Sequence, residues 1–506
     1  MNMTETLILL VCTLFVYTGI KIIYRLFFSP LAGFPGPLLA AATGFYEIYF
    51  DVVKGGQLMW EIERLHSKYG PVVRINPSEV HIRDPDFYDT LYVGKSRKRD
   101  KVPWFVYIGL PRSTFSTAQY SIHRKRRNIL SPFFTKRAIS NFGPVVSSKM
   151  SMVCYHLSKK VGTGDTLELQ SLFACFAADT LSTYVFGSTQ SSGYLESPDI
   201  TDDWKRKINS VFELLVLVRH FPWLLPLART LPSVASRILP TSSWVLQAET
   251  QIRESVKAVC DNPDGCLFDG SRKAMLSTIL ASDKAPNEEK DFERLAQEMT
   301  FIMVAGTDAP SQVIAITMFH ILRSPEIHQK LKAELNDAFP VPVSNADWNK
   351  LEHLPYLSAV IKEGLRISAV VTTRLPRIAP EETLYYKEWS LLPGTAVSMS
   401  NHFILRDTGI FPRPMEFLPE RWMTSPNEVR LLDKYLVPFA KGTSSCLGPY
   451  MAYSWLYSAV GTVIRKFDLE LYETNEENVR IVRDCFNGQT APGLNLIRVR
   501  VIKELD

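Results

Sequence analysis

The fold is decided by a stretch near the C-terminus, 439–448, which reads FAKGTSSCLG and directly precedes a predicted helix over 451–467. Gly442 permits a tight turn that aims the Cys446 sulfur, and Gly448 leaves room for a flat group against the backbone. A cysteine at a helix N-terminus meets the positive end of the helix dipole and free N–H groups, which favour the thiolate. A lone cysteine before a helix is more often buried and inert, so its assignment as a metal ligand needs further motifs.

Two motifs upstream of this stretch carry paired charges. Residues 362–366 read KEGLR, which places Glu363 and Arg366 at positions i and i+3 on one side of a predicted helix. Taken alone, this is the pattern of a surface ion pair. Residues 419–422 read PERW and supply a second arginine, Arg421.

Together with the F-x-x-G-x-x-x-C-x-G pattern, these motifs resemble the cytochrome P-450 superfamily, and the resemblance covers nearly the whole chain. It implies the cytochrome P-450 fold, mainly α with small β-sheets, and haem b as the cofactor. Cys446 would be the axial ligand of the iron, where a thiolate promotes cleavage of the O–O bond. Glu363, Arg366 and Arg421 would form a buried ionic triad with a structural role.

The resemblance also predicts how the haem propionates are held. The family usually has an arginine two places before the ligand cysteine, and this chain has Ser444 there. His123 and Arg127 on a predicted helix, together with Arg377, are the remaining candidates. Another departure is Trp455, where relatives often carry glutamate. The complete predicted cofactor-binding set is Cys446, His123, Arg127, Arg377, Phe439, Gly442 and Gly448.

The long helical pattern over 291–322 contains AGTDAPS at 305–311, which resembles the oxygen-activation segment of the family. Ala309 replaces the family's threonine, so we predict that Asp308 and Thr307 are the catalytic residues that handle protons. Ser311, a water or the substrate are the alternatives to Thr307. Pro310 cannot donate a hydrogen bond to the carbonyl four residues earlier, so we expect a kink that opens the helix there.

The N-terminus predicts a membrane anchor. Residues 7–20 form an uncharged apolar run, and 22–28 extend it past Lys21 and Arg25. A secretory signal would have positive charge before the apolar run, whereas here Glu5 precedes it. The positive-inside rule then leaves the short N-terminus lumenal and the bulk of the chain cytosolic. We therefore expect a single-pass protein of the endoplasmic reticulum membrane with a cytosolic catalytic domain. The alternative is a buried hydrophobic helix.

Three segments are therefore expected along the chain: an anchor over 1–28, a proline-rich hinge over 29–37 and one haem-thiolate catalytic domain over 38–506. Within the last, 72–82 predicts a β-hairpin and 383–399 a further β patch. The apolar segment 220–240 contains four prolines and is too broken to span a bilayer. It fits an interfacial membrane segment or a core loop equally well.

Composition excludes several classes of protein. The 506 residues include 46% hydrophobic and 22% charged residues with a net charge of +5, and no basic run is interleaved with aromatic residues, so nucleic acid is not an expected partner. The seven cysteines form no CxxC pair and the nine histidines no HxxxH pair, which argues against a common zinc site. The odd cysteine count favours a reducing compartment.

The leading functional hypothesis is a monooxygenase that hydroxylates or epoxidises an apolar small molecule. Its implied partners are NADPH-cytochrome P-450 reductase, docked near Lys441, and cytochrome b5. A haem-thiolate isomerase or dehydratase and a haem-binding sensor are the alternatives. The stretches 31–37, 68–75, 84–89 and 373–377 resemble fungal secondary-metabolism members of the trichodiene-oxygenase type. They favour a terpenoid or meroterpenoid substrate, with polyketides and alkaloids left open. The expected substrate walls are Trp104, Phe105, Tyr107, 212–217, Met303, Ala309 and 370–373.

Overall fold

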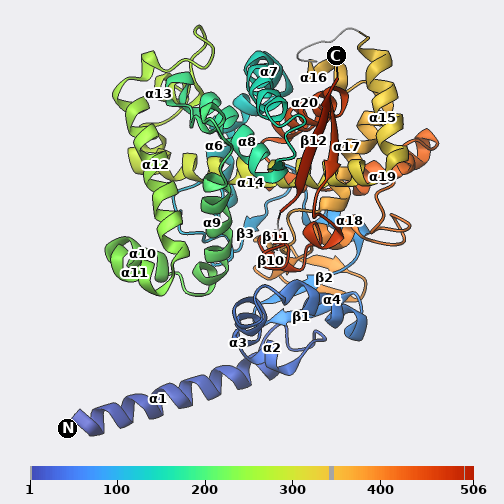
Figure 1. Ribbon diagram of the computed structural model, residues 1–506. Coiled ribbons are helices and arrows are strands. Elements are labelled where there is room, and N and C mark those ends of the chain that lie inside the picture. Colours follow the sequence, from blue (N-terminus) through green and yellow to red (C-terminus); the bar gives the residue numbers. More distant parts are fainter. Residues whose placement is uncertain (1–2, 341–346, 495, 506) are drawn as a thin grey trace.

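One long helix, α14 (Phe292–Arg323), crosses the centre of the molecule (Figure 1). The computed structural model describes residues 3–340, 347–494 and 496–505. The helices that pack on α14 are α8 (Leu169–Phe186), α12 (Thr241–Asp261), α17 (Pro355–Ser368) and α20 (Pro449–Lys466). All 18 residues of α8 are buried, as expected for a helix that is apolar on every side. The helices predicted over 291–322, 356–367 and 451–467 are confirmed.

Further helices surround this core, and with the small sheets they confirm the predicted fold class, mainly α with small β-sheets. They are α2 (Leu38–Ala42), α3 (Phe45–Ile48), α4 (Leu58–Tyr69), α5 (Tyr88–Leu91), α6 (Tyr120–Leu130), α7 (Lys136–Ser158), α9 (Asp203–His220), α10 (Leu224–Thr230), α11 (Pro232–Ile238), α13 (Met275–Ala281), α15 (Pro325–Ala338), α16 (Trp348–Leu351), α18 (Asn401–Leu405) and α19 (Pro426–Tyr435).

The largest sheet has the strand order β1-β2-β8-β5-β3. Its strands are β1 (Val72–Asn76), β2 (Glu79–Ile82), β8 (Ala396–Ser398), β5 (Arg377–Ile378) and β3 (Asp100–Lys101). The predicted hairpin is the antiparallel pair β1–β2, and β2 runs parallel to β8. The antiparallel pair β3–β5 sets Lys101 opposite Arg377, which brings two cations from distant parts of the sequence together.

Three smaller sheets complete the β structure of the described residues. They are β6 (Leu384–Tyr386) with β7 (Trp389–Leu391), β10 (Arg483–Cys485) with β11 (Asn487–Gln489), and β4 (Thr166–Glu168), β12 (Arg498–Glu504) and β9 (Phe467–Leu471) in that spatial order. The β patch predicted over 383–399 is therefore confirmed as β6, β7 and β8.

The N-terminal helix α1 (Met3–Ile23) continues as the π-helical turn η1 (Tyr24–Phe28) and projects away from the rest of the chain (Figure 1). Neither segment has a buried residue, although 3–28 is long and apolar enough to cross a membrane. The alternative of a buried N-terminal helix is therefore wrong.

The proline-rich segment over 29–37 is packed against β1. The buried Arg74 guanidinium donates to the carbonyls of Arg25 and Leu31 at 2.9 and 3.2 Å. A Cβ atom at Gly36 would lie only 2.4 Å from the Arg74 carbonyl oxygen, so glycine is required at this close approach. The segment joins the anchor to the sheet through fixed contacts.

The segment 220–240 forms α10 and α11, which follow α9 at a sharp bend of 118° between α9 and α10. Leu225 and Ala228 are buried beneath the pair. The other face exposes large apolar side chains, from Trp223, Leu227, Leu231, Val234 and Ile238. The core-loop alternative is therefore wrong for most of this segment.

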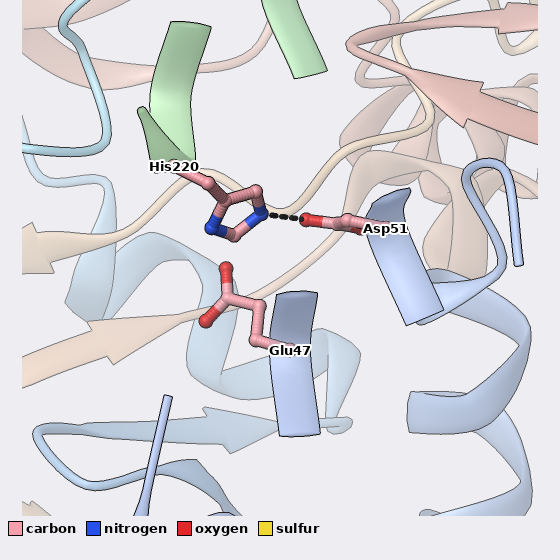
Figure 2. A group of neighbouring side chains, drawn as sticks. All are labelled: Glu47, Asp51 and His220. Atoms are coloured by element: carbon pink, nitrogen blue, oxygen red, sulfur yellow. Dashed lines mark hydrogen bonds and ion pairs between the residues drawn. The ribbon is translucent and has the colours of Figure 1, made fainter. Parts of the chain in front are cut away.

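Buried charges tie the end of α9 to the N-terminal segment (Figure 2). His220 Nε2 lies 2.9 Å from Asp51 Oδ2 in η2 (Tyr49–Val53), and the ring lies between this carboxylate and Glu47. Glu47 is itself bound by Arg374 at 2.6 Å and by Asn76 at 2.9 Å. Each of the three neighbouring side chains therefore has a hydrogen-bond or ion-pair partner within the protein.

The Glu363 carboxylate organises the contact between α17 and the short helix η9 (Pro419–Trp422). It accepts two hydrogen bonds from Arg366, at 2.8 and 2.9 Å, and one from Arg421 at 3.0 Å. The Leu418 N–H and the Trp422 indole N–H add two more, at 3.0 and 2.9 Å. Burial alone would raise the pKa of Glu363, but Arg366 and Arg421 outweigh it and the pKa is lowered.

The substitution Glu363→Ala should lower the free energy of unfolding by about 3–5 kcal/mol, because it leaves the fully buried Arg366 charge without its partner. Urea unfolding of the variant measures the change. The control is Glu477→Ala, which removes an exposed i, i+3 pair with Arg480 and should cost under about 1 kcal/mol. Equal losses in the two variants would contradict this role of Glu363.

The β10–β11 hairpin is fixed by Asp484. Its Oδ1 accepts from Thr372 Oγ1 at 2.8 Å and from the Phe486 N–H at 3.0 Å. These bonds hold Phe486 at a φ of +81°, a left-handed conformation that is strained for a bulky residue. Burial, with the nearby Asp51 carboxylate, raises the pKa of Asp484 to about 6.

This raised pKa predicts that Asp484 makes stability depend on pH. The native carboxyl, with a pKa of about 6 against an ordinary 3.8, binds its proton more tightly than the unfolded one. Its contribution to stability is therefore present below about pH 4 and is lost as the pH rises through 6. The full difference is roughly 3 kcal/mol.

We therefore expect Asp484→Asn to gain stability relative to the wild type as the pH rises from 5 to 7.5. The measurement is the thermal unfolding midpoint of both proteins across that range, with the exposed Asp165→Asn as the control. A constant difference between wild type and Asp484→Asn at every pH would show that the carboxyl does not titrate in this window.

Candidate active site

An internal cavity of about 420 Å³ separates the loop 439–448 from the middle of α14. Cys446 and Gly448 line one side, and Gly306, Ala309 and Pro310 line the other. The cavity thus places the predicted sulfur ligand opposite the predicted oxygen-activation segment.

The Cys446 sulfur is aimed by the backbone of its loop. Gly442 has a φ of +77°, and a Cβ atom there would lie 2.5 Å from the Val93 carbonyl oxygen, so only glycine fits. The Cys446 N–H donates to the Phe439 carbonyl at 2.8 Å, and α20 begins three residues later with Pro449 in its first turn. Gly442 itself does not line the cavity, so its predicted cofactor contact is replaced by a role in shaping the loop.

The protonation of Cys446 differs from the expectation. Burial raises the pKa of its thiol, although the Gly448 N–H and Arg127 act in the opposite direction. The helix N-terminus alone does not outweigh the loss of hydration. The side chain is exposed only to the cavity, where a bound cation would stabilise the thiolate.

Basic residues gather at one edge of the cavity. His123, Arg127 and Arg377 line it as predicted, and Lys101 lies beside them. Arg127 Nη1 donates to the Ser445 carbonyl at 2.7 Å, and Lys101 Nζ donates to the Phe115 carbonyl at 2.7 Å. Within the described ranges, none of these bases pairs with a carboxylate.

Burial lowers the pKa of each of these basic groups. The pKa of His123 falls to about 3, through burial and then through repulsion from Lys101 and Arg127. The pKa of Lys101 falls well below its ordinary value, again through burial first and then through Arg377. Such an edge would be stabilised by a dianion.

Taken together, the donors fit a haem. Cys446 offers one soft sulfur ligand, and the basic edge offers partners for two propionates. Phe439 and Gly448 also line the cavity, and a Cβ atom at Gly448 would meet the Phe134 ring at 3.5 Å and Met451 Cβ at 3.9 Å. Lys101 was missed by sequence reasoning because its place opposite Arg377 depends on pairing between distant strands.

On the α14 side, the two predicted catalytic residues, Thr307 and Asp308, differ in their hydrogen-bond partners. The Thr307 hydroxyl donates to the Met303 carbonyl of its own helix at 2.7 Å and does not line the cavity, so its proton-handling role stays a prediction. The Ser311 hydroxyl likewise donates to the Asp308 carbonyl, at 2.8 Å. α14 continues through Pro310 as one helix, and the expected kink stays a prediction.

Asp308 is buried behind the cavity wall. Its Oδ2 accepts from Asn487 Nδ2 at 2.6 Å and from Gln312 Nε2 at 2.9 Å. Burial raises the pKa of Asp308, and the two amides lower it in part. Asn487 lines the cavity, so it connects Asp308 to the site; the sequence offered no local signal for it.

The substrate walls agree with the prediction only in part. Phe105, Phe212, Leu214, Leu215, Ala309, Val370 and Val371 line the cavity, whereas Trp104, Tyr107, Met303, Thr372 and Thr373 do not. Sequence reasoning missed an aromatic group. Phe115 stacks on Phe301 with ring centroids 4.7 Å apart, and Phe486 meets Phe115 edge-on at 5.6 Å.

Comparison with known proteins agrees with this site. The family model described as Cytochrome P450 matches residues 45–484. The chain is 35% identical over 489 residues to cytochrome P450 monooxygenase aflU of Aspergillus parasiticus, covering 96% of this chain and 97% of the relative. It is 35% identical to conidiogenone synthase PchP450 of Penicillium rubens, covering 90% and 91%. It is 37% identical to tryptophan 6-hydroxylase fscE of Fusarium equiseti, covering 95% and 93%.

Three findings agree. The Cys446 sulfur faces a cavity with a basic edge, a family model matches most of the chain, and the relatives align over almost its whole length. The chain belongs to the cytochrome P450 family, as a haem-thiolate monooxygenase of the fungal secondary-metabolism type.

Proposed function

We propose that this monooxygenase hydroxylates or epoxidises a neutral, apolar secondary metabolite, with a terpenoid or meroterpenoid as the leading class. The charged residues at the substrate end of the cavity are already paired: Glu249 binds Arg229 at 3.0 Å, and Glu298 binds Arg294. A charged substrate would find no free partner there.

The names of the relatives do not decide between substrate classes, because one is a conidiogenone synthase and another a tryptophan 6-hydroxylase. The aromatic group of Phe115, Phe301 and Phe486 supports a rigid apolar substrate that packs against ring faces. Polyketides and alkaloids are the alternatives.

When bound, haem would supply the dioxygen-activating chemistry of a monooxygenase, which uses two electrons from an NADPH-dependent reductase and two protons and puts one oxygen into the substrate and the other into water. Cys446 would hold the iron, and His123, Arg127, Arg377 and Lys101 would bind the propionates. The apolar walls exclude water. Asp308 supplies protons, because Ala309 offers no hydroxyl and the Thr307 hydroxyl is bound to its own helix.

The single observation that carries this function is the Cys446 sulfur facing the cavity opposite α14. With a reductase and a panel of terpene substrates, the holoenzyme should consume NADPH and dioxygen only when substrate is present. Cys446→Ser should lose both product and the reduced carbon monoxide band of a thiolate-ligated haem, whereas Cys260→Ser, a half-buried cysteine away from the cavity, should keep them. Product formation without NADPH would instead indicate the isomerase or dehydratase.

The reductase, and cytochrome b5 as a second electron donor, would approach the side of the molecule that carries the Cys446 loop. Lys441 lies there, but its ammonium is paired with Asp89 at 2.8 Å. Docking at Lys441 would therefore have to compete with an existing ion pair.

For localisation, we propose a single-pass protein of the endoplasmic reticulum membrane with a cytosolic catalytic domain. Lys21 and Arg25 follow the apolar run, which favours this orientation. The short helices α2 and α3, which carry the exposed Leu38 and Phe45, lie next to the end of α1 (Figure 1). The helices α10 and α11, with their exposed apolar side chains, lie on the same side of the molecule as α1. These surfaces support a second contact with the bilayer.

This second contact predicts that the chain without residues 1–28 still floats with phosphatidylcholine vesicles. Replacing Trp223, Leu227 and Ile238 by aspartate in that shortened chain should abolish flotation, since the apolar face becomes charged. The matched control replaces three exposed apolar residues elsewhere, Met415, Leu431 and Ile502, by aspartate. If the variant with aspartate at 223, 227 and 238 still floats with the vesicles, the proposed contact is wrong.

A further inference from the structure

The amide of Asn487 bridges the cavity and the buried Asp308 carboxyl. Asn487 lines the cavity, whereas Asp308 lies behind the wall and is 3% exposed. The two side chains meet at 2.6 Å, although they are 179 positions apart in the sequence. This contact is the shortest hydrogen bond that the structure gives to Asp308, and it comes from outside α14.

The hairpin holds Asn487 in place through its backbone. Asn487 pairs with Val371 as an isolated β-bridge, and the Gly488 N–H donates to the Val370 carbonyl at 2.7 Å. A Cβ atom at Gly488 would lie 2.5 Å from Ile481 Cγ2, so the backbone at Gly488 is packed too closely to accept a larger residue. The strained Phe486 precedes it. A backbone fixed on both sides leaves the Asn487 amide little freedom to move away from Asp308.

The hydrogen bonds also decide which oxygen of Asp308 can carry a proton. Asn487 and Gln312 both donate to Oδ2, so a neutral carboxyl must bear its proton on Oδ1. The charge of Lys205 lowers the pKa of Asp308 from a distance, and Lys205 itself pairs with Glu168 at 2.9 Å. Oδ1 is therefore the atom that takes and releases the proton.

The hydroxyls of α14 do not offer another route. Those of Thr307 and Ser311 are donated to carbonyls of their own helix, and Ala309 has none. Pro310 lacks an N–H, so the Gly306 carbonyl at the cavity wall receives no helix hydrogen bond from it.

We propose that Asn487 is a positioning residue for the monooxygenase reaction, holding the Asp308 carboxyl at the cavity wall with its exchangeable proton on Oδ1. The step is a proton transfer: Asp308 gives one proton toward the cavity and regains one from solvent, while the electrons still come from NADPH through the reductase. The inference rests on the proton-carrying role proposed for Asp308.

The first measurement needs no turnover. Infrared spectra of the substrate-free holoprotein across pH should contain a carboxyl band that Asp308→Asn removes. In Asn487→Ala the midpoint of this band should rise by about one to two pH units, because the ionised carboxylate loses a hydrogen bond. Asn487→Asp, which preserves the shape of the side chain, should raise it further, since two adjacent carboxyls share one proton.

The second measurement is coupling, the fraction of NADPH electrons that appears in product instead of hydrogen peroxide. At saturating substrate, Asn487→Ala should lower it at least tenfold, in keeping with the usual worth of positioned proton transfer. The control is Gln489→Ala, a buried residue of the same strand whose side-chain nitrogen has no partner among the described residues. The reduced carbon monoxide band verifies that each variant holds haem correctly.

The outcomes separate the two levels of the proposal. If Asp308→Asn keeps wild-type coupling, the proton-carrying role of Asp308 fails and the inference fails with it. If Asp308→Asn uncouples the enzyme but Asn487→Ala shifts neither the infrared midpoint nor the coupling, the inference alone is wrong. A shift of equal size in Gln489→Ala would assign the effect to the hairpin as a whole and overturn the role of Asn487.

Discussion

The Glu363 carboxylate is the interaction on which the rest of the structure depends. Five donors converge on one buried anion, and they come from α17, from the start of η9 and from its tryptophan. Arg366 extends the network through the carbonyls of Leu405, Pro414 and Glu416. One anion therefore fixes three stretches of irregular backbone that hydrophobic packing alone would leave adjustable.

Local sequence patterns predicted the fold well. The site was harder to predict, because several of its residues come together only through contacts between distant parts of the chain. The Cys446 loop, the hairpin over 72–82 and the long helix α14 follow from spacing and periodicity, which a single sequence contains. Lys101 and Asn487 could not be found this way, because each acquires its neighbours from strands far along the chain. The direction of a hydroxyl is equally hidden in the sequence: that of Thr307 donates to a carbonyl of its own helix.

The polar contacts in Figure 2 connect α9, which forms part of the cavity wall, to the N-terminal segment that follows the anchor. α9 supplies Phe212, Leu214 and Leu215 to the cavity wall and ends at His220. His220 is held by Asp51, which follows the anchor by only a short stretch of packed chain. The orientation of one cavity wall is thus set relative to the N-terminal segment by a buried polar contact, which is more directional than apolar packing.

The basic edge formed by Lys101, Arg127 and Arg377 makes the stability of the folded chain depend on haem. Lys101 and Arg377 are buried and Arg127 is half-buried, and none of them has a carboxylate partner among the described residues. Keeping these groups charged therefore costs free energy until a dianion pairs with them. A ligand that binds only the folded state adds to stability in proportion to the logarithm of its free concentration. Newly made chains that wait for haem are therefore the form most exposed to unfolding and proteolysis, and the abundance of the enzyme in the cell follows the supply of haem as well as the rate of synthesis.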